Sequence, residues 1–179
     1  MANSTANSKS SAKVSFTEEL PIGSVSNSPR AIPLVFLDAS VIIAGFLSDT
    51  GGSFRLCRES REGRVRLLTN HYVVDEVEEV LQRKYPKRAA EVASFLMWGK
   101  MGIEKNPSTK TVKTVRDLIH YEDAPILAGA LRAKADFLVS LDRGDFFTAT
   151  LRNVDLPLHI VTPQMFFQEY WNIFFEHGA

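Results

Sequence analysis

The pattern of hydrophobic and polar positions divides the chain at Leu34. Residues 1–33 contain eight Ser, three Pro and few large apolar side chains. Such a segment cannot bury enough apolar surface to offset the entropy lost on ordering it. From Leu34 onward, short apolar runs alternate with amphipathic segments. We therefore expect a disordered Ser-rich tail over residues 1–33 and one folded domain over residues 34–179.

Four short apolar runs in the folded part have the length and composition of buried strands. They cover residues 34–37, 65–68, 137–141 and 158–161. Helical periodicity is found in the segments 41–47, 53–62, 72–85, 89–100, 124–134 and 163–175. The polar stretch from Gly102 to Lys113 predicts a loop. Strands that alternate with helices predict an α/β domain with a central, mostly parallel sheet covered on both faces.

Charge and cysteine content exclude several classes of protein. Lys and Arg number 21, as do Asp and Glu, so the chain is neither a highly basic nor a highly acidic protein. The single Cys57 excludes a disulfide within the chain and fits a reducing compartment, so we expect a cytoplasmic protein. Asp38 interrupts the longest apolar stretch, which predicts that no segment spans a membrane.

Two acidic residues occupy equivalent places at the ends of predicted strands. Asp38 follows the strand 34–37, and Asp142 follows the strand 137–141. The carboxyl ends of parallel strands share one edge of a sheet, and ligands bind in the crevice outside it. Either residue alone could be a helix N-cap or a turn residue, but the pair favours a site. Asp123 opens the helix 124–134, where it could be a cap, a ligand or both.

A fourth acid is expected on the helix 72–85, where four acidic residues compete. At about 100° per residue, the valines of this helix form one apolar stripe. Asp75 and Glu79 point away from the stripe, whereas Glu76 and Glu78 flank it on opposite sides. The helical geometry therefore leaves both Glu76 and Glu78 as candidates.

Four segments together resemble the PIN-domain nucleases, over roughly residues 34–162, and most closely the small bacterial PIN proteins of the toxin–antitoxin (VapC-like) type. The segments are Phe36-Leu37-Asp38-Ala39-Ser40-Val41, Glu76-Val77-Glu78-Glu79-Val80-Leu81, Asp123-Ala124-Pro125-Ile126-Leu127-Ala128 and Ala135-Asp136-Phe137-Leu138-Val139-Ser140-Leu141-Asp142. The resemblance implies a three-layer α/β/α PIN-like fold. It also implies that Mg²⁺ or Mn²⁺ is bound by four acids, which by position are Asp38, Glu76, Asp123 and Asp142. The resemblance thus selects Glu76 over Glu78, matches Ser40 to the family's hydroxyl residue, and makes Asp145 an auxiliary acid.

The donor set itself agrees with such a metal. Carboxylates without a Cys or His cluster are hard oxygen ligands, which favour Mg²⁺ or Mn²⁺ over zinc. Four carboxylates in one cleft would raise one another's pKa unless a cation lies among them. A bound metal would activate a water molecule and stabilise the leaving oxygen of a phosphodiester. We therefore expect a nuclease.

Basic residues accompany these acids. Nine Lys and Arg residues lie between Arg83 and Arg116, and five arginines lie between Arg55 and Arg66. A run of charge is often only a solvated face, but beside a metal–carboxylate site it favours a nucleic-acid track. The residues expected to bind RNA are Arg83, Lys84, Lys87 and Arg88.

These features predict a metal-dependent endoribonuclease that acts on single-stranded RNA. The preference for RNA, the role of toxin in a toxin–antitoxin pair and the antitoxin partner are implied by the resemblance. One alternative is a catalytically inactive PIN-like RNA-binding or scaffold module. Another is an Mg²⁺-dependent aspartyl phosphotransferase, although that chemistry usually has a second Asp where this chain has Ser40.

The last predicted helix is rich in aromatic residues, with six in ten positions. Phe167, Tyr170, Trp171 and Phe174 share one stripe at about 100° per residue, whereas Phe166 and Phe175 lie at its margins. Part of this surface is expected to close the core. The outward aromatic residues, Phe166 and Phe175, are expected to form an interface, and we expect a homodimer.

Overall fold

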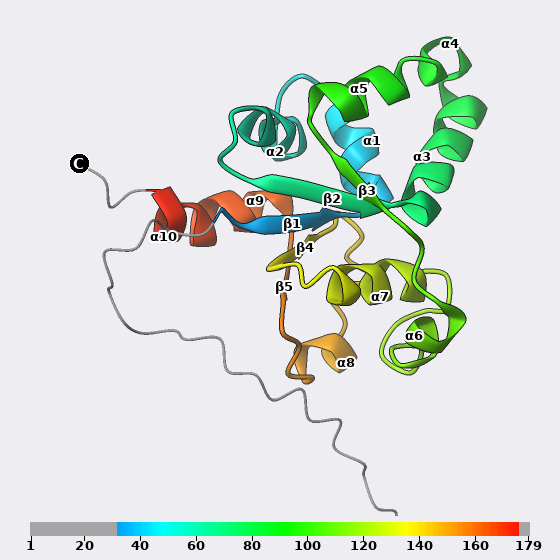
Figure 1. The fold of residues 1–179 in the computed structure, drawn as a ribbon, viewed down its shortest axis with the longest axis vertical. Coiled ribbons are helices and arrows are strands. Elements are labelled where there is room, and N and C mark those ends of the chain that lie inside the picture. The colour runs from blue at the N-terminus through cyan, green and yellow to red at the C-terminus, as the bar shows by residue number, and fades with distance from the viewer. Residues whose placement is uncertain (1–31, 176–179) are drawn as a thin grey trace, which may run out of the picture.

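The structure, a computed structural model, describes residues 32–175. The tail expected over residues 1–33 therefore lies almost entirely outside the described residues. The centre of the fold is a parallel sheet of five strands in the order β3-β2-β1-β4-β5 (Figure 1). The strands are β1 Leu34–Leu37, β2 Arg66–Asn70, β3 Gly102–Glu104, β4 Phe137–Val139 and β5 His159–Val161.

The strand order reverses between β1 and β4. Phe36 of β1 pairs with Leu68 of β2 on one side and with Leu138 of β4 on the other. The chain runs outward from β1 through β2 to β3, and then crosses back to β4 before it reaches β5. Crevices form outside the carboxyl ends of parallel strands at such a reversal. The fold therefore places a crevice where β1 and β4 end.

Helices cover both faces of the sheet, as right-handed crossovers require. Figure 1 shows α1, α2, α3 and α5 on one side and α6, α7 and α8 on the other. Their bounds are α1 Ala39–Leu47, α2 Gly52–Arg61, α3 His71–Lys84, α4 Pro86–Ala89, α5 Val92–Trp98, α6 Thr109–Lys113, α7 Ala124–Arg132 and α8 Ala149–Arg152. The predicted three-layer α/β/α architecture is thus confirmed. None of the helices within residues 32–175 is long and apolar enough to cross a membrane.

The segment from Gly102 to Lys113 is not the predicted loop, because it contains the edge strand β3 and the short helix α6. Leu68 of β2 pairs with Gly102, and a Cβ atom at Gly102 would lie 2.6 Å from the Leu68 side chain. Backbone pairing with β2 therefore holds β3, and the two strands approach closely at Gly102. Such pairing does not require an apolar pattern in the sequence. The hydroxyl of Ser108 caps α6 by accepting the Thr111 N–H at 3.2 Å.

The core between the sheet and its helices is built mainly from aliphatic and aromatic side chains. Phe36, Phe137 and Phe146 are among the largest side chains in it. Cys57 on α2 also belongs to the core, with 1% of its surface exposed. Burial raises the pKa of the Cys57 thiol to about 12. The only cysteine of the chain is therefore a structural residue.

The C-terminal segment is helical but not a regular α-helix. A π-helical turn, η1 Phe166–Tyr170, separates α9 Pro163–Met165 from α10 Trp171–Phe175. Because the hydrogen bonds of a π-turn span five residues, the aromatic side chains do not follow the spacing of 100° per residue. Phe166 is fully buried, and its ring meets that of Phe137 edge-on at 5.0 Å. The prediction that Phe166 faces outward is therefore wrong.

An arginine cluster joins this C-terminal segment to α2. The guanidinium of Arg55 lies over the Phe167 ring, 4.0 Å from its centre, a favourable cation–π geometry. Glu59, only 2% exposed, forms ion pairs with Arg55, Arg58 and Arg64. Three of the five arginines between Arg55 and Arg66 are thus engaged with one buried carboxylate.

Candidate active site

Asp38 lies at the end of β1, where the chain turns into α1. Its backbone N–H continues the sheet by donating to Val139 O of β4 at 3.1 Å. Its Oδ1 caps α1 by accepting the Ala39 N–H at 2.7 Å. Only 5% of the residue is exposed, so its carboxylate must be satisfied by protein groups or by a cation.

Two serine hydroxyls hold the other carboxylate oxygen of Asp38. Ser40 Oγ donates to Asp38 Oδ2 at 2.5 Å, and Ser140 Oγ donates to the same oxygen at 2.8 Å. Each hydroxyl also accepts a backbone N–H from the segment after β4: Ser40 from Leu141 at 3.0 Å, and Ser140 from Asp142 at 2.9 Å. The orientation of Asp38 is therefore tied to the segment that carries Asp142. Asp38 accepts three hydrogen bonds in all, which leaves one acceptor direction free on Oδ1.

Asp142 is exposed and organises the turn that follows β4. Its Oδ1 accepts the N–H of Gly144 at 2.8 Å and that of Asp145 at 3.1 Å. Asparagine and aspartate commonly stabilise turns in this way. Asp145, three residues after Asp142, is held in the same turn by the second of these hydrogen bonds. Asp142 therefore acts as a turn residue and still has its second carboxylate oxygen free of protein partners among the described residues.

Asp123 precedes α7 but does not cap it. No side-chain capping bond forms there, and Pro125 occupies the first turn. The pKa of Asp123 is raised to about 6, first by burial and then by the carboxylates of Asp145, Asp38 and Asp142. Repulsion of this kind acts only over short range in a partly buried site. Asp123 therefore lies near the two acids at the strand ends.

Glu76 lies in the second turn of α3, on the side that faces these acids. Its pKa is raised to about 7, first by desolvation and then by Asp38 and Asp123, with smaller contributions from Glu79 and Glu122. The helical geometry left both Glu76 and Glu78 as candidates, and the contributions of Asp38 and Asp123 show that Glu76 lies near these two acids. Asp38 and Asp123 thus act on the pKa of Glu76, while Asp38 and Asp142 act on that of Asp123.

Asn70 joins the two helices that carry Glu76 and Asp123. Its Oδ1 caps α3 by accepting the Val73 N–H at 3.0 Å, and its Nδ2 donates to Pro125 O of α7 at 3.3 Å. A glycine permits this approach, because a Cβ atom at Gly129 would lie 2.6 Å from Asn70 Nδ2 and 3.1 Å from the Phe36 ring. Both helices therefore begin at fixed positions beside the end of β1.

Ser140 and Asn70 were missed by the sequence analysis, although both are fully buried. Asn70 is the last residue of β2, and Ser140 directly follows β4, so both lie at the predicted edge of the sheet. That placement is the signal that could have identified them. They were overlooked because a single Ser or Asn has many structural roles, and its partners are distant in sequence.

The acids fit a divalent metal by their chemistry. All the donors are carboxylate oxygens, as Mg²⁺ and Mn²⁺ prefer. The pKa values of Glu76 and Asp123 are raised first by burial and then by repulsion from neighbouring carboxylates, and a cation would relieve that repulsion. Within residues 32–175, no three Asp, Glu, His or Cys side chains are gathered closely enough to enclose an ion. These carboxylates lie at the crevice expected outside the ends of β1 and β4, called here the carboxylate cleft, and among the described residues they do not form a closed cage.

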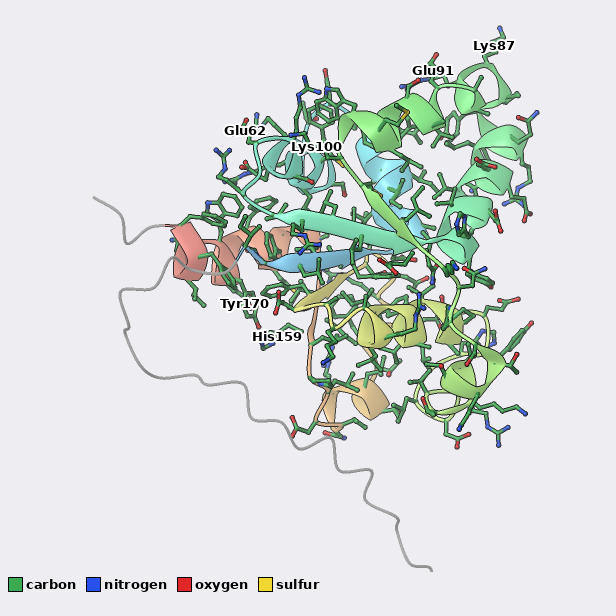
Figure 2. All side chains as sticks on the ribbon, in the orientation of Figure 1. Glu62, Lys87, Glu91, Lys100, His159 and Tyr170 are labelled. Atoms are coloured by element: carbon green, nitrogen blue, oxygen red, sulfur yellow. The ribbon has the colours of Figure 1, made fainter. Side chains whose placement is uncertain are left out.

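The basic residues expected to bind RNA differ in their surroundings. Arg83 pairs with Glu79 at 3.1 Å, and Arg88 donates to Phe46 O at 3.1 Å while its guanidinium lies 4.6 Å from the centre of the Phe46 ring. Lys84 and Lys87 form no ion pair with the residues that the structure describes. Lys87 projects from the outer tip of α4 (Figure 2). Arg88 therefore has a structural role, whereas the two lysines are available to a ligand.

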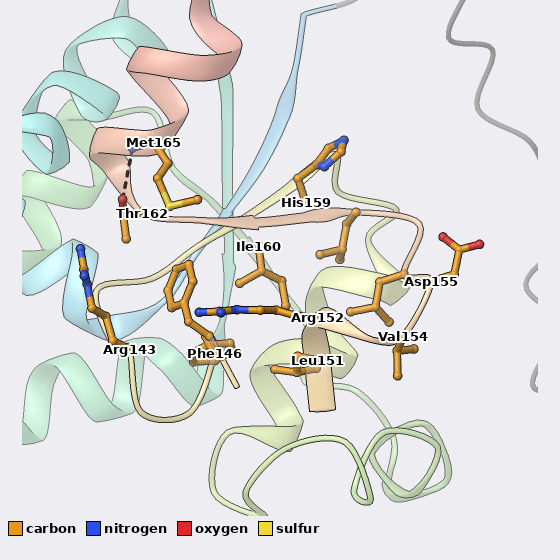
Figure 3. A pocket seen from close by; sticks show the side chains of 13 residues that line it. Arg143, Phe146, Leu151, Arg152, Val154, Asp155, His159, Ile160, Thr162 and Met165 are labelled. Carbon is orange, nitrogen blue, oxygen red and sulfur yellow. Dashed lines mark hydrogen bonds between the residues drawn. The ribbon is translucent and has the colours of Figure 1, made fainter. Parts of the chain in front are cut away.

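A cavity of about 670 Å³ lies elsewhere, along the edge strand β5 (Figure 3). Its lining includes Phe146, Arg152 and Ile160, and the Thr162 hydroxyl at its margin accepts the Met165 N–H at 3.1 Å. None of the four candidate acids lines it. The cavity therefore lies outside the four acids, although Arg143, the neighbour of Asp142, is one of its lining residues.

Comparison with known proteins identifies the family. A family model of the PIN domain matches residues 34–144, which is well over half of the chain. Among solved structures, the chain is similar to the crystal structure of Mycobacterium tuberculosis VapC20, which is described as a sarcin–ricin loop cleaving toxin. The TM-score is 0.49 and the sequence identity is 17%, and the match covers 62% of this chain and 91% of that chain. No curated protein matches the sequence. On the match of the family model, the chain belongs to the PIN-domain family of nucleases.

Proposed function

We propose that this PIN-domain protein is a metal-dependent endoribonuclease that hydrolyses phosphodiester bonds of single-stranded RNA. The observation that carries the proposal is the grouping of four acids at the carboxyl edge of the sheet, where Asp38 and Asp123 raise the pKa of Glu76, and Asp38 and Asp142 raise that of Asp123. Asp145 belongs to the same cluster through its effect on Asp123. Clusters of carboxylates with perturbed pKa values are typical of functional sites.

The four acids would hold Mg²⁺ or Mn²⁺. When bound, such an ion supplies an activated water molecule and stabilises the charge that develops on the leaving oxygen. Asp38 would offer the free acceptor direction of its Oδ1, while Ser40 and Ser140 keep its other oxygen fixed. Glu76 and Asp123, with pKa values of about 7 and 6, would lose their protons as a cation enters.

The substrate and partners follow from the surface and from the family. Lys84 and Lys87 would contact the phosphates of an RNA strand, whereas Arg83 and Arg88 beside them are engaged with Glu79 and Phe46. A role as the toxin of a toxin–antitoxin pair would add an antitoxin protein as a partner, and the proposed site of action is the cytoplasm. These assignments rest on the family and on the sequence features, and they extend the nuclease proposal.

The direct test is cleavage of an end-labelled single-stranded RNA by the full chain. We expect cleavage with Mg²⁺ or Mn²⁺ and none with EDTA. Asp38→Asn should abolish cleavage, because the amide removes the charge while its oxygen can still accept the Ala39 N–H. Glu78→Gln is the matched control, since Glu78 is exposed on the same helix as Glu76 and should be dispensable.

Circular dichroism should show that both variants keep the fold of the wild type. Undiminished cleavage by the Asp38→Asn protein would overturn the assignment of the site. Cleavage that persists in EDTA would overturn the metal dependence.

A further inference from the structure

An aromatic side chain projects into solvent beside the candidate acids. Tyr121 is 70% exposed and lies two residues before Asp123, on the segment that leads into α7. A single exposed large side chain is common on protein surfaces. The feature that singles out Tyr121 is its position two residues before a candidate metal ligand, Asp123.

The ring of Tyr121 is held in place by its neighbours. Its hydroxyl donates to Glu122 Oε1 at 2.9 Å, and its ring centre is 4.5 Å from that of His120, with the planes tilted by 47°. His120 in turn lies 3.7 Å from the carboxylate of Glu122. A ring fixed at its edge by a hydrogen bond loses less entropy when its face receives a ligand. Tyr121 is thus a partly ordered, solvent-facing aromatic surface.

A second tyrosine shows where this surface lies. Tyr72, at the start of α3, is half-buried, and its backbone N–H donates to Asn106 Oδ1 at 2.7 Å. Burial raises its pKa first, followed by the charges of Glu76, Glu122 and Asp123 and by Tyr121. Tyr72 therefore lies within short electrostatic range of two candidate metal ligands and of Tyr121. Tyr72 and Tyr121 thus both lie near the candidate acids, the first half-buried and the second exposed.

Positive charge lies on the neighbouring helix. α6 packs against α7 and carries Lys110 and Lys113, which form no ion pair with any residue in the part of the chain that the structure describes. An aromatic surface flanked by basic residues is the arrangement that proteins use for single-stranded nucleic acids, with bases stacked on rings and phosphates near lysines.

We propose that the Tyr121 ring stacks on an unpaired base of the RNA strand whose phosphodiester lies at the carboxylate cleft. This inference rests on the proposed function and deepens it, because a base can reach the ring only when it is not stacked in a duplex. The site therefore selects single-stranded segments, loops or bulges. Stacking is tolerant of base identity, so Tyr121 contributes affinity and strand selection without reading a sequence.

The test measures binding of a twelve-nucleotide single-stranded RNA in the Asp38→Asn background, which prevents cleavage during titration. Tyr121→Ala should weaken binding by about 5- to 150-fold, the equivalent of the loss of one stacked base. Tyr121→Phe should bind within about twofold of the parent, because it keeps the ring. Met97→Ala is the control, since Met97 is 79% exposed on α5, away from α6 and α7 (Figure 1).

A set of RNAs with one abasic nucleotide, moved along the strand, identifies the base that stacks. At one position the missing base should weaken binding to the Tyr121 parent but not to the Tyr121→Ala protein, which is the signature of a direct contact. If the wild type cleaves RNA and Tyr121→Ala binds it within twofold of the parent, the stacking proposal is wrong and the nuclease proposal stands. If the wild type neither binds nor cleaves RNA, both are wrong.

Discussion

At the scale of single residues, the site depends on hydroxyl groups as much as on carboxylates. Ser40 and Ser140 each donate to Asp38 and accept an N–H from the segment that leads to Asp142. Loss of either hydroxyl would therefore remove one hydrogen bond from the carboxylate of Asp38 and one from the loop. Charge-assisted hydrogen bonds of this kind are shorter and stronger than those between neutral groups, so they fix a buried charge in one orientation.

The raised pKa of Glu76 predicts how stability depends on pH in the absence of metal. Its pKa is 4.5 in a model compound and about 7 in the fold. Between these values the folded state binds more protons than the unfolded state, so stability falls as the pH rises. We expect the melting temperature of the metal-free protein to decrease from pH 4.5 to pH 7.5. The melting temperature of the Glu76→Gln protein should decrease less over this range, and at pH 7.5 it should be higher than that of the wild type.

Glu78→Gln should follow the wild-type curve and serves as the control. Addition of Mg²⁺ at pH 7.5 should raise the melting temperature of the wild type more than that of the Glu76→Gln protein, since a ligand of the folded state stabilises it. Parallel curves for the wild type and the Glu76→Gln protein would contradict the assigned pKa.

The acidic residues of the site could be proposed from sequence because strand ends, helix periodicity and the family resemblance each contributed. Asp38 and Asp142 follow apolar runs, whereas the valines of α3 only narrowed the choice to Glu76 and Glu78, and the resemblance selected Glu76. The hydrogen bonds of Ser140 and Asn70 could not be predicted in this way. Their partners, Asp38 and Pro125, are 102 and 55 residues away, and no local pattern encodes such a pairing.

At the scale of elements, α3 joins the acids to the basic residues. Glu76 and Lys84 are eight residues apart, which at 1.5 Å per residue is about 12 Å along the helix axis. A single strand with its scissile phosphate at the cleft could extend along α3 toward α4. The helix would then position the strand as well as one candidate metal ligand.

The double variant Lys84→Gln and Lys87→Gln tests this role of α3 and α4. For single strands, each lost phosphate contact lowers the slope of log K against log salt by about 0.7, so the slope should fall by about 1.4. Salt titrations of RNA binding provide the measurement. Arg88 is left intact, because its contacts with Phe46 stabilise the fold.

Lys134→Gln is the control for that experiment, since Lys134 is exposed beyond the opposite end of α7 from Asp123. An unchanged salt slope in the double variant would show that Lys84 and Lys87 belong to an ordinary solvated face.

Elements were predicted well where side-chain patterns specify them and poorly where backbone pairing does. The strands β1 and β4 have clear apolar runs. In contrast, β3 is a three-residue edge strand, and its exposed Ile103 and Glu104 do not alternate between apolar and polar positions as a half-buried strand would. The π-turn η1 changes the angular spacing on which the prediction of the outward aromatic residues relied. Backbone hydrogen bonds, unlike apolar periodicity, leave little trace in the sequence.

At the scale of the whole molecule, the C-terminal segment remains the proposed surface for self-association. Phe175 is half-buried in the described chain, and its ring centre is 4.1 Å from that of Trp171. Light scattering at micromolar concentration should show a homodimer, and Phe175→Ser should shift it toward monomer with little loss of stability. A monomeric wild type at high concentration would contradict the homodimer.

Phe166→Ala distinguishes an interface from the core. Because Phe166 is fully buried, its truncation should lower the free energy of unfolding by about 3–5 kcal/mol, as measured by urea denaturation. If Phe166→Ala left stability unchanged, the packing of η1 on Phe137 would be wrong.

Chemical modification of the buried Cys57 would report how often the core of the domain opens. Thiol reagents attack the thiolate, and a thiol that is 1% exposed with a pKa of about 12 offers almost none. Because the chain has no other cysteine, every modification event reports that α2 has separated from the sheet. The rate of modification would therefore report openings of the core directly. A ligand bound at the carboxylate cleft would lower this rate only if it stabilised the whole domain against opening.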